Sequence, residues 1–206
     1  MSRIPPVPRY QLSAAQQKTH DALVDIAEAG FGSKFTWEDD NDALVGPFPF
    51  FMQVPEVGEG LLKLIMLLGK LPLPKDAREV VILTFGAHFK VRSASQQGSC
   101  ADALNKAGYE VYSHEAVALA DGILSKEIVE ALKAGKKPPE LNEGGSAAYD
   151  AAHYLASTPG PMPQELWDRC NAAFGHDGTV ALVHYAGFYA YICVVLNACD
   201  TPVPNK

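Results

Sequence analysis

An acid and an imidazole lie four residues apart in the helical pattern of Tyr109–Gly122. A helix places Glu110 and His114 on one face, one turn apart. The rings of Tyr109 and Tyr112 flank that face and would shield it from water. An exposed Glu–His pair at this spacing is also common, and it stabilises a helix by only about 0.2–0.5 kcal/mol. The pattern therefore fits a proton-transfer site or an ordinary surface pair.

A third candidate, Glu79, lies in an apolar stretch of the predicted helix 75–90. Burying a carboxylate is costly unless it is paired. We therefore expect Glu79 to bond to Arg78, His88 or His114, or to keep a raised pKa. A purely structural Glu–Arg pair is the alternative.

Three segments together resemble the carboxymuconolactone decarboxylase family, which is related to the alkylhydroperoxidase D-like proteins. They are Leu73–Leu83, Tyr109–His114 and Gly122–Val129. The resemblance covers roughly residues 44–204, apart from an apparent insertion at 91–107. It implies the alkylhydroperoxidase D-like helical bundle, subunits that associate as dimers, trimers or hexamers, and a functional glutamate at the position of Glu79.

The peroxidase branch of that superfamily uses a Cys-x-x-Cys-x-x-x-His motif, because one thiolate attacks the peroxide and a second thiol resolves the product. The matching positions here hold Ala107, Glu110 and His114, so thiol-based peroxide reduction is excluded at this site. Cys100 lies in the apparent insertion and supplies no pair. Glu110 in place of the thiol resembles the decarboxylase-like branch.

This resemblance predicts a decarboxylase-like lyase that acts on a small lactone, β-keto or polyketide-type carboxylic acid. His114 would donate the proton, since its reference pKa of about 6.5 rises beside carboxylates. Glu110 and Glu79 would orient it or relay the proton. The alternatives are an isomerase or cyclase of secondary metabolism that uses the same site, and a non-catalytic ligand-binding or assembly protein.

No metal and no cofactor are expected. His114-Glu115-x-x-Ala118 lacks the second histidine of a zinc-protease motif. Substrate contacts are expected from Tyr109, Tyr112 and the Pro47-Phe48 segment, which the resemblance places against the pocket. His184 on the last predicted helix is a further candidate, with ordinary core packing as the alternative.

Composition limits the class of protein. The net charge of -7 and the lack of a large Lys/Arg cluster exclude a typical nucleic-acid-binding surface. The N-terminal segment is proline-rich and lacks a signal-peptide pattern, and the apolar runs are interrupted by polar residues. We expect a cytoplasmic homo-oligomer with a small-molecule acid as substrate, no membrane partner and four reduced cysteines.

Every long segment has helical periodicity, which predicts an all-α fold in a single domain, 1–206, with an N-terminal extension and first helix at 1–43. Residues 44–51 are expected to form an apolar loop. The helix over 56–69 is expected to be almost wholly buried. The last helix, 179–198, is apolar nearly all round and predicts a central position or a subunit interface. Whether 91–107 covers or disables the pocket is left open.

Overall fold

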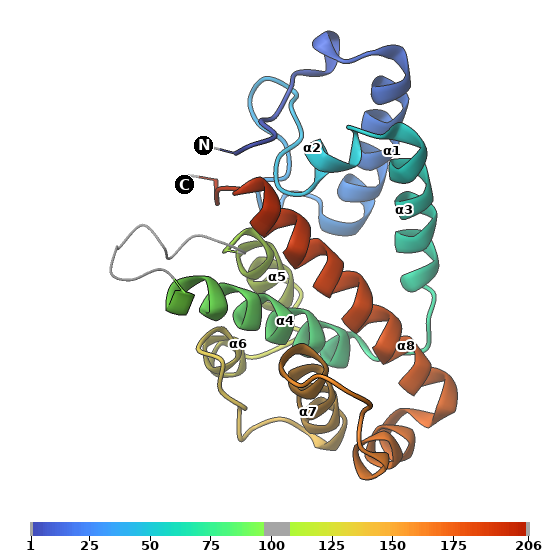
Figure 1. Ribbon diagram of the computed structural model, residues 1–206, viewed down its shortest axis with the longest axis vertical. Helices are drawn as coiled ribbons and strands as arrows, with labels where there is room; N and C mark the ends of the chain where they lie inside the picture. The colour runs from blue at the N-terminus through green and yellow to red at the C-terminus, as the bar shows by residue number, and fades with distance from the viewer. Residues whose placement is uncertain (1, 97–107, 205–206) are drawn as a thin grey trace.

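The computed structural model describes residues 2–96 and 108–204 of the 206-residue chain, and it is all-helical (Figure 1). The described residues form eight α-helices and a short 3-10 turn at Arg9–Gln11, with no strand among them. This confirms the predicted all-α class. The helices are α1 (Ala14–Phe31), α2 (Phe48–Phe51), α3 (Pro55–Leu68), α4 (Lys75–Gln96), α5 (Gly108–Ala120), α6 (Lys126–Lys133), α7 (Glu143–Ser157) and α8 (Gln164–Cys199).

Polar side chains cap the starts of three helices, because the first turn of a helix has backbone N–H groups without partners inside the helix. Ser13 accepts a hydrogen bond from the backbone of Gln16 at the start of α1, in a capping box. Ser125 and Asn142 do the same for α6 and α7. The sequence predicts the caps at Ser13 and Ser125, and it leaves the start of α7 open between Asn142 and Ser146, of which Asn142 is the cap.

Helix α4 is the centre of the larger apolar core, and it packs against α5, α6, α7 and α8 (Figure 1). Its side chains Val80, Val81 and Leu83 are fully buried. A second apolar cluster joins α1, α2 and α3 to α5 and the end of α8. Helices α5 and α8 each contribute to both clusters. Their facing sides therefore meet where the two clusters adjoin.

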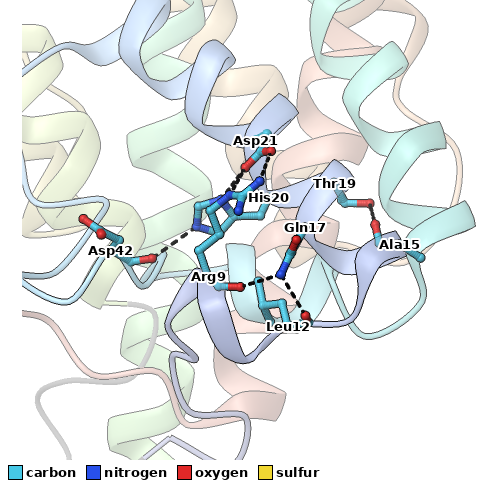
Figure 2. A network of polar contacts seen from close by, with 8 residues as sticks. All are labelled: Arg9, Leu12, Ala15, Gln17, Thr19, His20, Asp21 and Asp42. Atoms are coloured by element: carbon cyan, nitrogen blue, oxygen red, sulfur yellow. Dashed lines mark hydrogen bonds and ion pairs between the residues drawn. The ribbon is translucent and has the colours of Figure 1, made fainter.

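A network of polar contacts fastens the N-terminal segment to α1 and to the loop that precedes α2 (Figure 2). Arg9 donates two hydrogen bonds of 2.6 Å to the carboxylate of Asp21. The ring of His20 is buried, with Nδ1 3.2 Å from that carboxylate and Nε2 3.2 Å from the carbonyl oxygen of Asp42. The loop that leads to Pro47 and Phe48 is thereby held against α1.

Gly46 sits in this loop at a φ of 71°, which a residue with a side chain rarely adopts. A Cβ atom built at this position would overlap the ring of Tyr109. Glycine therefore lets the loop lie directly on the first turn of α5. The close approach brings Pro47 and Phe48 to the Glu110 and His114 face.

Three expectations about the elements need correction. Residues 48–51 form a short helix, α2, instead of a loop throughout. Helix α4 continues to Gln96, so the first part of the apparent insertion is helical, and 97–107 lie outside the described residues. Helix α3 is not almost wholly buried, since Leu64, Met66 and Leu67 are exposed. Helix α8 is interrupted at Gly175, whose φ of 70° is not helical, so its last part is a separate helical segment, in agreement with the helix predicted at 179–198.

Helix α8 is long and apolar enough to cross a membrane, judged by length and composition alone. In the fold, 56% of its most apolar window is buried inside the protein. It packs on α4 and α7 (Figure 1). A core helix of a helical bundle has the same properties.

Candidate functional site

The imidazole of His114 lies between two buried carboxylates. Its Nδ1 is 2.9 Å from Oε2 of Glu79, a hydrogen bond that joins α5 to α4. Its Nε2 is 3.3 Å from Oε1 of Glu110, one turn earlier on α5. All three side chains are less than a tenth exposed. The structure thus brings together the three residues predicted to be catalytic.

The packing also settles which partner Glu79 takes. Of the three candidates, Glu79 pairs with His114, whereas Arg78 donates its hydrogen bonds to backbone carbonyls of Gly69, Leu71 and Leu73. Glu79 as acceptor holds the imidazole with a proton on Nδ1. In the neutral ring, Nε2 then carries a lone pair that can accept a proton, and the protonated ring can deliver that proton again.

Burial raises the pKa of Glu110 to about 7, with Glu79 adding to the rise and His114 opposing it. For His114 the largest influence, burial, lowers the pKa, but the charge and hydrogen bond of Glu79 and the charge of Glu110 outweigh it. The pKa of His114 therefore lies above its ordinary value. Glu110 thus exchanges its proton near neutral pH, where acid–base catalysis is most effective, and His114 keeps its proton to higher pH than an ordinary histidine does.

One oxygen of the site has no hydrogen-bond partner among the described residues. Oε1 of Glu110 is buried, and its contact with Nε2 of His114 lacks hydrogen-bond angles. A buried carboxyl oxygen without a partner is costly. A substrate atom that bonds to Glu110 would remove this cost on binding.

A small apolar cavity of about 80 Å³ borders Glu110, Ser113 and His114. The remaining walls come from α1, the loop after it, α2, α3, α5 and α8. They consist of Leu23, Ile26, Phe31, Phe35, Pro47, Phe48, Phe51, Ile65, Tyr109, Phe188, Tyr189 and Ile192. A cavity with one polar wall suits a largely apolar ligand whose reacting atom faces that wall.

A second cavity, of about 290 Å³, reaches the other side of the same histidine. We call it the Arg78 cavity, because Arg78 and Lys75 line it together with Glu79 and His114. It shares Ile26, Phe31, Ile65, His114, Phe188 and Tyr189 with the apolar cavity. His114 therefore borders two adjoining cavities, one with mostly apolar walls and one that several charged side chains line.

The two tyrosines of α5 have different roles. The hydroxyl of Tyr109 donates to the carbonyl of Thr36 at 2.9 Å, and the hydroxyl of Tyr112 accepts from the Thr36 backbone N–H at 3.0 Å. Both rings thus hold the loop after α1 against the site. Only Tyr109 lines the apolar cavity, as Pro47 and Phe48 do. Tyr112 lines neither cavity, and a substrate contact by this residue stays a prediction.

His184, the remaining predicted substrate-binding residue, is exposed on α8 and lines neither of these cavities. The residues of α8 that line the apolar cavity are Phe188, Tyr189 and Ile192, and the centroid of the Tyr189 ring lies 5.2 Å from that of His114. Because α8 is apolar nearly all round, its sequence carries little signal for which side faces the site. Helix α1 was likewise missed as a cavity wall, although its inward face was predicted.

Metal binding has little support from the geometry. Within residues 2–96 and 108–204, no group of three or more His, Cys, Asp and Glu side chains is arranged to hold a metal ion. Both ring nitrogens of His114 already face carboxylates. A cofactor-independent site stays a prediction. The cysteines at 170, 193 and 199 are free and buried, and Cys100 lies outside the described residues.

The candidate site was compared with known proteins through the whole sequence. The chain matches no model of a known protein family, and a search of curated proteins finds no significant match.

Proposed function

We propose that this protein is a cofactor-independent, decarboxylase-like enzyme with an alkylhydroperoxidase D-like helical fold. Its substrate would be a small lactone, β-keto or polyketide-type carboxylic acid. The observation that carries the proposal is the imidazole of His114 held between the buried carboxylates of Glu79 and Glu110, in the wall of an apolar cavity. The resemblance of the Glu79 and Glu110–His114 segments to carboxymuconolactone decarboxylases supports the same reaction class.

The cavity favours loss of carbon dioxide from a bound acid. When the bond between the carboxylate and its neighbouring carbon breaks, the electron pair passes to a conjugated carbonyl of the substrate and gives an enolate or dienolate. Apolar walls such as Phe48 and Phe51 exclude water, so the charged carboxylate is held in surroundings that suit the neutral product better. No metal is needed when the substrate delocalises its own electrons.

The enolate must then gain a proton. Nε2 of protonated His114 supplies it, while Glu79 keeps its hydrogen bond to Nδ1 and orients the ring. Glu110, 3.3 Å from Nε2, is placed to return a proton to the histidine. The balance is one carboxylate and one proton converted to carbon dioxide and a protonated product.

Replacing His114 by Gln is expected to reduce carbon dioxide release at least ~100-fold, because general acid catalysis typically contributes ~10²–10⁴-fold. The measurement is release from γ-carboxymuconolactone and a panel of β-keto and aromatic polyketide acids. The Glu115→Gln variant is the control, since Glu115 follows His114 but pairs with Lys133 outside the site. Turnover that survives in the His114 variant would refute the proposal.

Isomerisation is the second candidate, because the contact between Glu110 and His114 places two proton-exchanging groups, each with a raised pKa, side by side. One of them would remove a proton from carbon and the other would return it elsewhere. Uptake of deuterium from D₂O without carbon dioxide release would identify this reaction. If the protein released no carbon dioxide and exchanged no proton with any acid tested, a ligand-binding protein of the same fold would be favoured.

We also propose that the protein is a homo-oligomer. Val57 and Leu67 of α3 and Val194 of α8 are each more than half exposed, so these apolar side chains are available for contacts between copies of the chain. Copies of the chain would cover them, and light scattering should therefore give a mass above 22.1 kDa. A monomer at every concentration tested would contradict this.

A further inference from the structure

The contacts to its two carboxylates do not by themselves fix the ring of His114. The hydrogen bond to Glu79 is a single contact at Nδ1, and without support on the face of the ring the imidazole can rotate away from it. The contact of Nε2 with Glu110 lacks hydrogen-bond angles. A further contact is therefore needed to keep Nε2 directed at Glu110 and the apolar cavity.

A column of rings supplies that contact. The ring of Tyr189 is perpendicular to that of His114, with an interplanar angle of 90° and centroids 5.2 Å apart. Tyr189 in turn stacks parallel to Tyr185, at 7° and 6.1 Å. Perpendicular and parallel arrangements at these distances are the favoured geometries of aromatic pairs.

The far end of the column is anchored to the backbone. The guanidinium of Arg78 lies over the ring of Tyr185, with its central carbon 5.3 Å from the centroid. Arg78 donates hydrogen bonds of 2.6 Å and 2.7 Å to the carbonyls of Leu73 and Leu71, in the segment between α3 and α4. The hydroxyl of Tyr185 donates to the carbonyl of Leu68 at 3.1 Å. The column therefore has little freedom at this end.

We propose that Tyr189 is a positioning residue, which holds His114 in its productive orientation through a stack anchored by Tyr185 and Arg78. Its effect on rate rests on the proposed function, whereas its effect on the histidine ring does not. The ring of Phe188 also contacts Tyr189: the two rings are perpendicular, and their centroids are 5.3 Å apart. The aromatic ring, and not the hydroxyl, performs this role.

The test compares Tyr189→Leu with the conservative Tyr189→Phe. Nitrogen NMR of the ¹⁵N-labelled imidazole reports the tautomer of neutral His114. We expect a proton on Nδ1 in the unmodified protein and in Tyr189→Phe, and a mixture of tautomers in Tyr189→Leu. Misplacement by about 1 Å costs up to ~100-fold in rate, so kcat should fall about 10- to 100-fold in Tyr189→Leu with little change in KM.

Two further variants complete the test: one is a control for a general loss of structure, and the other weakens the anchored end of the column. Tyr191→Leu removes a ring two positions away on α8, outside the column, and should leave the tautomer and kcat unchanged. Arg78→Lys keeps the charge but loses the forked hydrogen bonds, and should mix the tautomers more weakly than Tyr189→Leu.

The tautomer measurement decides the proposal even if no substrate is found. A single Nδ1–H tautomer in both Tyr189→Leu and Arg78→Lys would overturn it. So would a Tyr189→Phe variant as impaired as Tyr189→Leu, because the hydroxyl would then be the important group.

Discussion

Replacing Glu110 by Gln is expected to stabilise the protein at pH 8 and to abolish most of its activity. The pKa of Glu110 rises from 4.5 to about 7 on folding because the side chain is buried. The folded protein therefore holds this proton more tightly than the unfolded chain does, and stability declines as the pH rises from about 4.5 to about 7. By linkage, ionising Glu110 in the fold costs about 3 kcal/mol at pH 8.

Glutamine has nearly the same shape and carries no charge, so it avoids that cost. The loss of attraction between Glu110 and His114 offsets part of the gain. A net gain of about 2 kcal/mol would raise the Tm by roughly 4–8 °C in a chain of this size. At pH 5, where Glu110 is protonated in the fold, the Tm should change little.

Thermal unfolding of both proteins from pH 5 to pH 8 checks this prediction. The informative quantity is the difference in Tm, which should grow with pH. Glu115→Gln is again the control, because its partly exposed pair with Lys133 contributes at most about 1 kcal/mol. A Tm difference that is independent of pH would mean that ionisation of Glu110 does not destabilise the folded protein.

Replacing Glu79 by Gln is expected to lower kcat at pH 8 by roughly 100-fold or more, the typical contribution of an acid–base group. Glu79 contributes through its charge and its hydrogen bond to the raised pKa of His114. Without that charge, the histidine loses its proton at lower pH. The alkaline decline of the kcat profile should therefore move to lower pH.

Replacing Glu79 by a smaller side chain should mainly lower the stability of the fold. Glu79→Ala leaves a buried histidine without its anchor, and breaking a buried pair in this way costs about 3–5 kcal/mol. Because folding raises the pKa of His114, its protonated form stabilises the folded protein. This contribution is fully present below the pKa of the unfolded chain and is lost as the pH rises through the pKa in the folded protein. The Tm loss of Glu79→Ala should therefore be largest at acidic pH.

The pH–rate profile and the pH dependence of Tm together check the role of Glu79. We expect Glu79→Gln to shift the kcat profile and Glu79→Ala to lower the Tm as well. If Glu79→Gln retained both the rate and the profile of the unmodified protein, Glu79 would be a structural acid with no part in the reaction.

The local structure could be predicted where polar and apolar residues alternate clearly along the sequence. Ser13, Ser125 and Asn142 cap helices because each precedes an amphipathic segment and has a side-chain acceptor. Glu110 and His114 share a face because four residues span about one helical turn. These inferences need no knowledge of distant contacts, and the structure agrees with them.

The sequence by itself determined that the chain is helical and that one helix carries an acid and an imidazole together. Only the tertiary structure decided that Glu79 faces His114 and not Arg78 or His88, because that depends on how α4 packs against α5. It also decided that Tyr189, and not His184, reaches the site. An amphipathic helix reveals its inner face by the contrast between polar and apolar sides, and α8 is apolar nearly all round. Its orientation is therefore set by the neighbouring helices that it contacts.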